Sequence, residues 1–262
     1  ANKSSFAKQF AKVADVYVSD NFGTAHRAHA SVARIPDLLP SYAGFLVESE
    51  VDALERIIKN QERPVVVVLG GAKLETKLPL IERFIKLGSE TLVGGTLANT
   101  LFSARGIEIG KSVIDEKFVE KVRYLKSKRL HLPVDVCVAH VATGRVRVAS
   151  VDDVARDESI FDVGPDTIKL FDSIIKKART IVWNGPMGFA EVAKFSRGTK
   201  EVARAIQMSH AFSIVGGGDT LAILKKYKLL GRFNHVSTGG GAMLEFLAGK
   251  KLPGIEALKR KL

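Results

Sequence analysis

The sequence predicts an α/β fold built on a doubly wound parallel sheet, and two observations carry this prediction. First, a short, mostly β-branched apolar run is followed at once by glycine at five places along the chain. These runs are PVVVVL before Gly70, ETLV before Gly94, TIVWN before Gly185, FSIV before Gly216 and HVST before Gly239. Second, apolar residues recur at helical spacing between the runs. Strands that alternate with helices form parallel sheets buried on both faces, which explains why each run is continuously apolar.

Helices are expected after three of these strands. The residues that indicate them are Leu78, Ile81 and Ile85 after the first strand, Phe118, Val122 and Leu125 after the second, and Leu221 and Leu224 after the fourth. The segment VDVCVA at 134–139 is expected as a further parallel strand, without a terminal glycine. Ligands of such sheets bind outside the carboxyl ends of the strands, near the point where strand order reverses. Consecutive glycines at that edge let backbone N–H groups approach a ligand closely.

The first 47 residues have a different pattern. Val16–Val18 is predicted as a lone strand, followed by a proline-containing loop that runs to Tyr42. A helix is expected over residues 48–60, because Val51, Leu54 and Ile57 fall on one of its faces. One strand without a sequential partner cannot complete a layer, so residues 1–47 are interpreted as a remnant of a second α/β lobe.

The chain ends in GKKLPGIEALKRKL, which is basic and interrupted by Pro253 and Gly254. We expect this segment to be an extension on the surface.

Composition bounds the class of protein. The chain has 262 residues, of which 46% are hydrophobic and 26% charged, as in globular proteins. Its apolar runs are far shorter than the ~20 residues of a membrane helix. The single cysteine, Cys137, excludes an internal disulfide and fits a reducing compartment. Because the N-terminal residues lack the pattern of a secretory signal, we expect a cytoplasmic protein.

The net charge points to anionic ligands. Forty Lys and Arg residues against 28 Asp and Glu residues give a formal charge of +12. Such a charge attracts polyanions, whether nucleic acid, anionic lipid or phosphorylated small molecules, and the total alone does not choose among them.

Two lysines open the helix that follows the first strand. Lys73 and Lys77 lie four residues apart, after Gly70-Gly71-Ala72. Cations in a first helical turn oppose the helix dipole and repel one another, so a purely structural helix would favour Asp or Glu there. The two lysines are therefore either solvated or arranged around an anion. The spacing is not that of a Walker A loop.

The segment Gly216-Gly217-Gly218-Asp219-Thr220 combines exposed N–H groups, a hydroxyl and a carboxylate. Asp219 is either a helix N-cap or a carboxylate close to Mg²⁺. A phosphate cradle beside a carboxylate suits a magnesium nucleotide, and Lys77 could supply positive charge to a phosphoryl group in transfer.

Arg27 stands between His26 and His29, after Gly23-Thr24. Two histidines three apart suggest a metal, but no third ligand is suitably spaced. Binding of an oxyanion by Arg27 is the better interpretation.

Together these motifs resemble the phosphoglycerate kinase family. The motifs that carry the resemblance occur in the family's order between about residues 6 and 254: DVYVSDNFGTAHRAHAS, VVLGGAKLETK, LVGGTLANTLF, IEIGKS, LPVD, FDVGPDT, IVWNGPMG, GGGDT and VSTGGGA. The resemblance implies a two-lobed α/β enzyme with a Rossmann-like nucleotide lobe. It also implies reversible phosphoryl transfer between ATP and 3-phosphoglycerate with Mg²⁺, in glycolysis, by lobes that close about a hinge.

The resemblance implies roles for residues around the base and ribose. Gly71, Ala72 and Gly95 match positions that line the family's adenine pocket. Glu191 matches the residue that hydrogen-bonds the ribose, and Asn184 matches one that contacts a nucleotide phosphate. The sequence departs from the family pattern at Phe189-Ala190, where an aliphatic residue and then Phe are usual, and at Ile160, where glycine is common.

Further matches concern the phosphates and the triose. Lys73 and Lys77 match paired lysines at the nucleotide phosphates, and Lys77 is expected to stabilise the phosphoryl group in transfer. The residues that match the phosphate cradle are Gly217, Gly218, Asp219 and Thr220, with Asp219 placing Mg²⁺. Gly240 and Gly241 match a helix N-terminus that faces the reacting phosphates. Arg27 matches an arginine that binds the triose from the other lobe.

The resemblance also implies a domain plan. Residues 1–47 would be the remnant of an N-terminal substrate lobe, 48–60 the interlobe helix, 61–245 the nucleotide-binding lobe and 246–262 a C-terminal extension. Most of the N-terminal lobe would be missing, so we expect the isolated chain to be inactive.

Two alternatives remain open at this point. A non-catalytic nucleotide-binding module is the first, and polyanion binding driven by the charge is the second. The expected partners are small molecules, without nucleic acid or membrane, and the family is usually monomeric.

Overall fold

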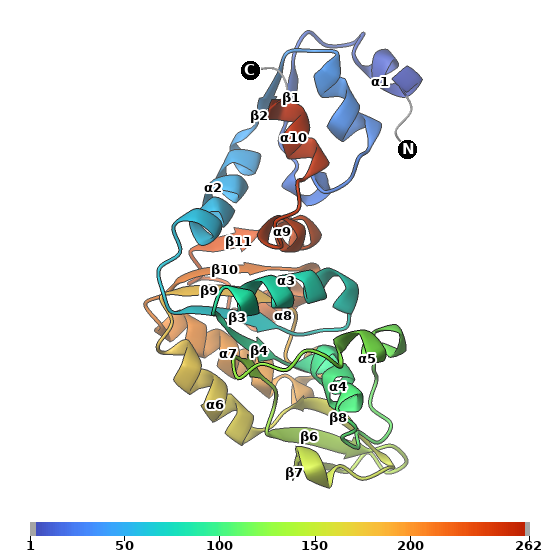
Figure 1. The fold of residues 1–262 in the computed structure, drawn as a ribbon, viewed down its shortest axis with the longest axis vertical. Helices are drawn as coiled ribbons and strands as arrows, with labels where there is room; N and C mark the ends of the chain where they lie inside the picture. Colours follow the sequence, from blue (N-terminus) through green and yellow to red (C-terminus); the bar gives the residue numbers. More distant parts are fainter. Residues whose placement is uncertain (1–3, 260–262) are drawn as a thin grey trace. The chain divides into compact units, whose positions relative to one another are not determined.

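The computed structural model of the protein describes residues 4–259 (Figure 1). They divide into two compact units. Unit 2 runs from Gln61 to Val236, and unit 1 consists of the residues up to Asn60 together with those from Ser237 on.

Unit 2 is built on the predicted parallel sheet. Its strands are β3 (Val65–Leu69), β4 (Glu90–Val93), β5 (Leu130–His131), β9 (Thr180–Asn184), β10 (Phe212–Gly216) and β11 (His235–Ser237), in the spatial order β11-β10-β9-β3-β4-β5. The pairs β10–β9, β9–β3, β3–β4 and β4–β5 are all parallel. The chain continues from β3 to β4 on one side, whereas β9 lies on the other, so strand order reverses between β3 and β9.

Helices cover this sheet (Figure 1). They are α3 (Leu74–Lys86), α4 (Gly95–Ala104), α5 (Glu116–Val122), α6 (Pro165–Ile175), α7 (Arg197–Met208) and α8 (Gly218–Lys226), with short 3₁₀ turns η4 (Val151–Asp153) and η5 (Ala193–Phe195). Phe171 of α6 and Val202 of α7 pack in one core cluster with Ile181 and Trp183 of β9. The doubly wound α/β class predicted from the sequence is thus confirmed.

The prediction that residues 134–139 join the parallel sheet was wrong. The strand there is β6 (Asp135–His140), which pairs in antiparallel register with β7 (Val146–Ser150) and β8 (Glu158–Val163) in a separate sheet of order β7-β6-β8. Only five residues join β6 to β7. A connection that short permits a hairpin, whereas a parallel crossover needs a dozen residues or more.

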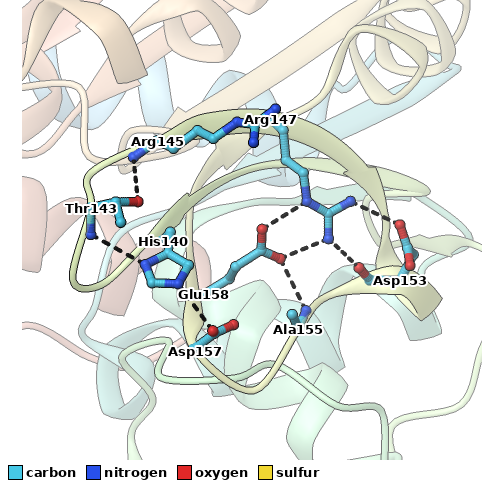
Figure 2. A network of polar contacts seen from close by, with 8 residues as sticks. All are labelled: His140, Thr143, Arg145, Arg147, Asp153, Ala155, Asp157 and Glu158. Atoms are coloured by element: carbon cyan, nitrogen blue, oxygen red, sulfur yellow. Dashed lines mark hydrogen bonds and ion pairs between the residues drawn. The ribbon is translucent and has the colours of Figure 1, made fainter.

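Charged side chains join β6 and β7 to the loop before β8 (Figure 2). The Arg147 guanidinium donates to Glu158 Oε1 at 2.7 Å and to Asp153 Oδ2 at 2.8 Å. His140 Nε2 lies 3.0 Å from Asp157 Oδ2. The hydrogen bonds from Arg147 hold the pKa of the Glu158 carboxyl below its ordinary value. We assign this network a structural role, because it ties the loop around Asp153 to the hairpin.

Unit 1 contains short elements from both ends of the described chain. They are α1 (Ser4–Phe10), β1 (Tyr17–Ser19), the 3₁₀ turn η1 (Phe22–Thr24), the π-helical segment η2 (Ala30–Arg34), the 3₁₀ turn η3 (Ile35–Asp37), β2 (Ser41–Ala43), α2 (Phe45–Lys59), α9 (Gly240–Leu247) and α10 (Pro253–Lys259). The lone strand predicted at 16–18 is wrong in one respect, because β1 pairs in parallel with β2. The predicted proline-containing loop to Tyr42 therefore ends in a strand.

The helix predicted over residues 48–60 is present, but it begins earlier, at Phe45. Asp20 explains the difference, because its Oδ1 accepts hydrogen bonds from the N–H groups of Leu46 at 2.7 Å and Val47 at 3.2 Å. A Cβ on Gly44 would lie 2.4 Å from the Asp20 carboxyl carbon. The start of the helix is thus capped by an aspartate distant in sequence. Glycine is needed at position 44 because a side chain there would collide with this aspartate.

The prediction of a surface extension at the C-terminus was wrong for the residues that the structure describes, up to Lys259. Pro253 begins α10 rather than interrupting it, which is a favourable place for proline. Leu252, Ile255 and Ala257 are buried, and a Cβ on Gly254 would lie 2.7 Å from a Val32 methyl carbon. This segment is therefore part of the packing of unit 1. No helix among residues 4–259 is both long and apolar enough to cross a bilayer.

Candidate functional site

The candidate site lies where strand order reverses, at the carboxyl ends of β3 and β9. The loops after these strands pack backbone against backbone. Gly71 N donates to Pro186 O at 2.9 Å. A Cβ on Gly70 would lie 1.9 Å from Pro186 O, and one on Gly185 would lie 2.1 Å from Gly70 O. These two glycines are needed because the loops touch each other.

The loop after β4 joins the same assembly. Gly95 N donates to Met187 O at 2.7 Å, and a Cβ on Gly95 would lie 2.8 Å from Gly71 N. The paired glycines at this edge were predicted to let backbone N–H groups approach a ligand. For Gly71 and Gly95 that reason was wrong, because both amides are already bonded to carbonyls of the β9 loop.

A cavity of about 390 Å³ opens beside these loops, within unit 2. Gly71, Ala72 and Gly95 line it, as do Glu191 and Asp219. Most of its remaining wall is apolar; the large apolar residues there are Phe102, Val113, Pro133, Val136, Ile160, Phe161, Val163, Pro186, Met187 and Phe189. This size and lining are typical of a site for a small molecule with an apolar part.

Lys77 is the buried cation of the site. It lies on α3, and its Nζ is 3.8 Å from the place that a Cβ on Gly71 would occupy and 3.4 Å from Lys73 O. Burial, and secondly the charge of exposed Lys73, lower the pKa of Lys77 to about 8, while the charge of Asp219 acts in the opposite direction. A buried ammonium beside a second lysine is costly by itself and is stabilised by an anion.

The N-terminus of α8 faces the same region. Gly217 has φ +103°, a conformation that favours glycine, and it precedes the first helical residue, Gly218. A Cβ on Gly218 would meet nothing within 4 Å. The first N–H groups of α8 have no partner within the helix, so this end can bind an anion. Asp219 is exposed in the first turn and forms no side-chain cap, so the N-cap alternative was wrong.

Two predicted phosphate ligands have structural roles. Asn184 is buried, and its Nδ2 donates to Gly216 O at 3.0 Å. Thr220 is also buried, and its hydroxyl accepts from Gly185 N at 2.7 Å. Asn184 thus links the ends of β9 and β10, and Thr220 holds the β9 loop to the start of α8. A direct contact of either with a ligand stays a prediction.

Asp219 is the carboxylate best placed to hold a cation. Residues 4–259 contain no group of three or more His, Cys, Asp or Glu side chains with the geometry of a metal site. Mg²⁺ is commonly bound through one or two carboxylates, waters and the oxygens of a substrate phosphate. A single exposed carboxylate beside an anion-binding helix end fits that mode of binding.

Unit 1 holds the remaining predicted residues. Arg27 is exposed just after η1, and its backbone N–H donates to Thr24 O at 2.9 Å. Gly240 and Gly241 begin α9. A Cβ on Gly241 would lie 3.5 Å from His26 Nε2, so the residue next to Arg27 packs against this helix start.

The structure adds residues that sequence reasoning missed. Asp162 lines the cavity and is 3% exposed; its oxygens accept from Val163 N at 2.9 Å and Gly198 N at 2.8 Å. Burial raises its pKa to about 7 despite these bonds. Val136 and Phe161 come from the antiparallel sheet, whose strands were not predicted to lie beside the cavity. The FDVGPDT segment, which contains Phe161 and Asp162, was the available signal.

Comparisons with known proteins agree with this architecture. The family model described as "Phosphoglycerate kinase" matches residues 1–250. A relative from Thermomicrobium roseum with that name is 45% identical over 98% of this chain and 68% of its own length. One from Pelotomaculum thermopropionicum is 43% identical over 99% and 68%.

Solved structures give the same result. The phosphoglycerate kinase of Coxiella burnetii superposes with a TM-score of 0.90 at 43% identity, covering 99% of this chain and 69% of its own. That of Pyrococcus horikoshii gives a TM-score of 0.89 at 35% identity, with the same coverage. The chain therefore belongs to the phosphoglycerate kinase family, and it spans about two thirds of the length of these relatives.

Proposed function

We propose that unit 2 binds ATP or ADP with Mg²⁺, and that the chain is the nucleotide-binding part of a phosphoglycerate kinase. The reaction is reversible transfer of a phosphoryl group between ATP and 3-phosphoglycerate, giving ADP and 1,3-bisphosphoglycerate, in the cytoplasm. The observation that carries the proposal is the arrangement of an apolar cavity, the buried Lys77 ammonium and the start of α8 around the reversal in strand order. A nucleotide has a matching flat base and anionic tail.

The base and ribose would occupy the cavity. Gly71, Ala72 and Gly95 line it and would bound the adenine, with Glu191 at the ribose. Lys73 and Lys77 would bind the phosphates. The residues proposed to complete the phosphate site are Asn184, Gly217, Gly218, Asp219 and Thr220.

Asp219 would hold Mg²⁺ together with phosphate oxygens of the nucleotide. The ion supplies charge neutralisation on the phosphates when bound. One exposed carboxylate suffices for this mode of binding, and Asp219 provides it.

The chain's own groups would act by charge and position. The carboxylate of 3-phosphoglycerate attacks the γ-phosphoryl in line, without a covalent enzyme intermediate. Lys77 would stabilise charge on the transferring group, and Gly218 and Gly241 would present helix N-termini to the phosphates. Arg27 would bind the triose. Closure about the 48–60 helix would exclude water.

We propose that residues 1–47 serve the substrate and residues 61–245 the nucleotide, as the sequence suggests. The chain spans about two thirds of its relatives, so we expect it to bind nucleotide without turning over 3-phosphoglycerate. A non-catalytic nucleotide-binding module is the second candidate, favoured by the fact that the cavity lies wholly within unit 2.

Titration calorimetry with Mg-ADP tests the proposal. The double variant Lys73→Ala, Lys77→Ala should weaken ADP binding by about 10- to 100-fold, because two charge-assisted contacts are lost. Lys86→Ala, at the other end of α3, is the matched control and should leave affinity unchanged. Unchanged affinity in the double variant would remove both lysines from the site.

Two further measurements separate the alternatives. Turnover of 3-phosphoglycerate by the purified chain, followed by ADP release, would contradict the expectation of inactivity. Polyanion binding instead predicts a salt-dependent affinity for nucleic acid that Mg-ATP does not displace.

A further inference from the structure

Glu191 lies in the loop between β9 and η5 and lines the cavity of unit 2. The residue is exposed, and its carboxylate forms no ion pair within residues 4–259. A long, exposed side chain adopts many rotamers, so ordering it on a ligand costs conformational entropy. The contacts that fix the backbone of Glu191 therefore decide how well its carboxylate can serve a bound ligand.

The residues before Glu191 differ from the family pattern, because Phe189-Ala190 stands where an aliphatic residue and then Phe are usual. Ala190 is fully buried but small. The loop is closed by short-range hydrogen bonds, from Ala190 N to Gly188 O at 2.9 Å and from Val192 N to Phe189 O at 3.1 Å. These bonds shape the loop from within and do not connect it to α8.

Lys226 makes the connection between this loop and α8. It lies in the last turn of α8, and its Nζ donates to the main-chain O of Glu191 at 2.9 Å. Because Lys226 binds the carbonyl and not the carboxylate, the side chain of Glu191 stays available to a ligand. The first turn of the same helix carries the proposed phosphate site with Asp219. Helix α8 therefore links the two ends of the proposed nucleotide site.

The ammonium group of Lys226 is exposed but has further stabilising contacts. Its Nζ lies 5.4 Å from the centroid of the Tyr227 ring, and Nζ of Lys200 on α7 lies 4.9 Å from the same centroid. An aromatic ring attracts cations at such distances. A positive charge in the last turn of a helix is also favourable with the helix dipole. These contacts favour the position from which Lys226 donates to Glu191.

We propose that Lys226 is a positioning residue for the ribose: by holding the carbonyl of Glu191 to the end of α8, it directs the Glu191 carboxylate towards the ribose hydroxyls of the bound nucleotide. Lys226 is not among the described residues that line the cavity, so it acts through Glu191. The inference rests on the proposed function, because it requires Glu191 at the ribose.

Titration calorimetry with two magnesium nucleotides tests the inference. ADP carries both ribose hydroxyls, and its dideoxy analogue carries neither. Hydrogen bonds to a carboxylate should make the wild type bind ADP at least about tenfold more tightly than the analogue. Lys226→Met should lower this ratio to about threefold or less by weakening ADP binding alone. Its affinity for the dideoxy analogue should equal that of the wild type.

Two further variants make the result specific. Lys225→Met replaces the neighbouring exposed lysine in the same turn of α8 and should leave both affinities unchanged. In a Glu191→Ala background the carboxylate is absent, so adding Lys226→Met should not weaken ADP binding further. A merely structural role of Lys226 would instead weaken binding of both nucleotides, with or without Glu191.

The outcomes separate the inference from the proposed function. Wild-type chain that does not bind ADP contradicts the proposed function. Wild-type chain that binds ADP and the analogue equally contradicts the place of Glu191 at the ribose, and the role of Lys226 with it. A wild-type preference for ADP that Lys226→Met retains in full overturns the positioning role alone. A further loss of ADP affinity in the Glu191→Ala background also overturns it, because Lys226 would then not act through the carboxylate.

Discussion

At the scale of one residue, Lys77 is a buried charge that the folded chain retains although its burial costs free energy. Its side chain is 5% exposed and has Lys73 as a neighbour. A buried ammonium without a full counter-charge destabilises the folded chain. Such a group is expected where a ligand supplies the missing charge.

The pKa of Lys77 gives a stability prediction. Its value of about 8 in the folded chain lies below the ordinary 10.5, mainly through burial. Below pH 8 the buried charge destabilises the folded state. Between about pH 8 and 10.5 the folded chain releases this proton before the unfolded chain does, so the free energy of unfolding rises with pH. Lys77→Met should therefore raise the free energy of unfolding by about 2 kcal/mol at pH 7.

Urea unfolding at pH 7 and at pH 10.5 measures this effect. The difference between variant and wild type should be largest at pH 7 and shrink at the higher pH. A methionine variant less stable than the wild type at pH 7 would show that the ammonium is already well compensated in the free chain.

The glycines show what a sequence reveals about a residue and what it does not. Their position at the carboxyl edge was predictable, because each follows an apolar run. The reason why glycine is needed there was not predictable. The close approach of Pro186 O to the place of a Cβ on Gly70 depends on a strand more than a hundred residues away. Sequence alone does not distinguish a glycine that admits a ligand from one that admits another loop.

At the scale of elements, three helices are capped from a distance. Asp20 caps α2, Asp135 caps α6 and Asp162 caps α7, in each case by accepting backbone N–H groups at the helix start. None of these helices has a hydrogen bond from its own N-cap side chain. Each cap therefore couples a helix to the strand or loop that carries the aspartate.

Asp135 offers the clearest test of this coupling. Its carboxylate accepts from Thr167 N at 2.7 Å and Asp166 N at 3.0 Å, and also from the Thr167 hydroxyl. Asp135→Ala should lower the free energy of unfolding by about 1–3 kcal/mol, since it removes a cap and leaves buried donors unsatisfied. Chemical unfolding followed by circular dichroism measures it.

Asp166→Ala is the matched control for this prediction. Asp166 lies in the same helical turn, and its side chain forms an exposed ion pair with Lys169. Exposed pairs contribute little, so this variant should stay within about 0.5 kcal/mol of the wild type. Equal effects of the two substitutions would contradict the proposed cap.

Some of the helices and strands were predictable from the sequence pattern and others were not. Strands β3, β4, β9 and β10 could be found because parallel, buried strands are continuously apolar. The two-residue β5 has too little sequence for any pattern, and β6 resembles a parallel strand because it is nearly as buried. Helix α4 was missed because it is buried almost all round and has no polar face to give a period.

At the scale of the whole molecule, exposed apolar side chains are unevenly distributed. Nine of the 19 large apolar residues that are exposed in the described chain lie in residues 4–46. They are Phe6, Phe10, Val13, Val16, Val18, Leu38, Tyr42, Phe45 and Leu46. Such a density on a small segment indicates weak burial of its secondary structure or a surface for another polypeptide.

Amide hydrogen exchange tests the consequence for stability. β1 has three residues and a single partner strand, whereas all five residues of β3 are buried between β4 and β9. Amides of β1 and β2 should therefore exchange at least about 100-fold faster than those of β3, because local opening exposes little additional apolar surface.

If amides of β1 and β2 exchange slowly, repeating the measurement at several protein concentrations identifies the cause. Exchange of β1 that slows as concentration rises would show that its open edge pairs with another copy, as unpaired edges tend to do. Exchange as slow as that of β3 and independent of concentration would contradict the prediction. It would mean that residues 4–46 are stabilised within one chain despite their exposed apolar side chains.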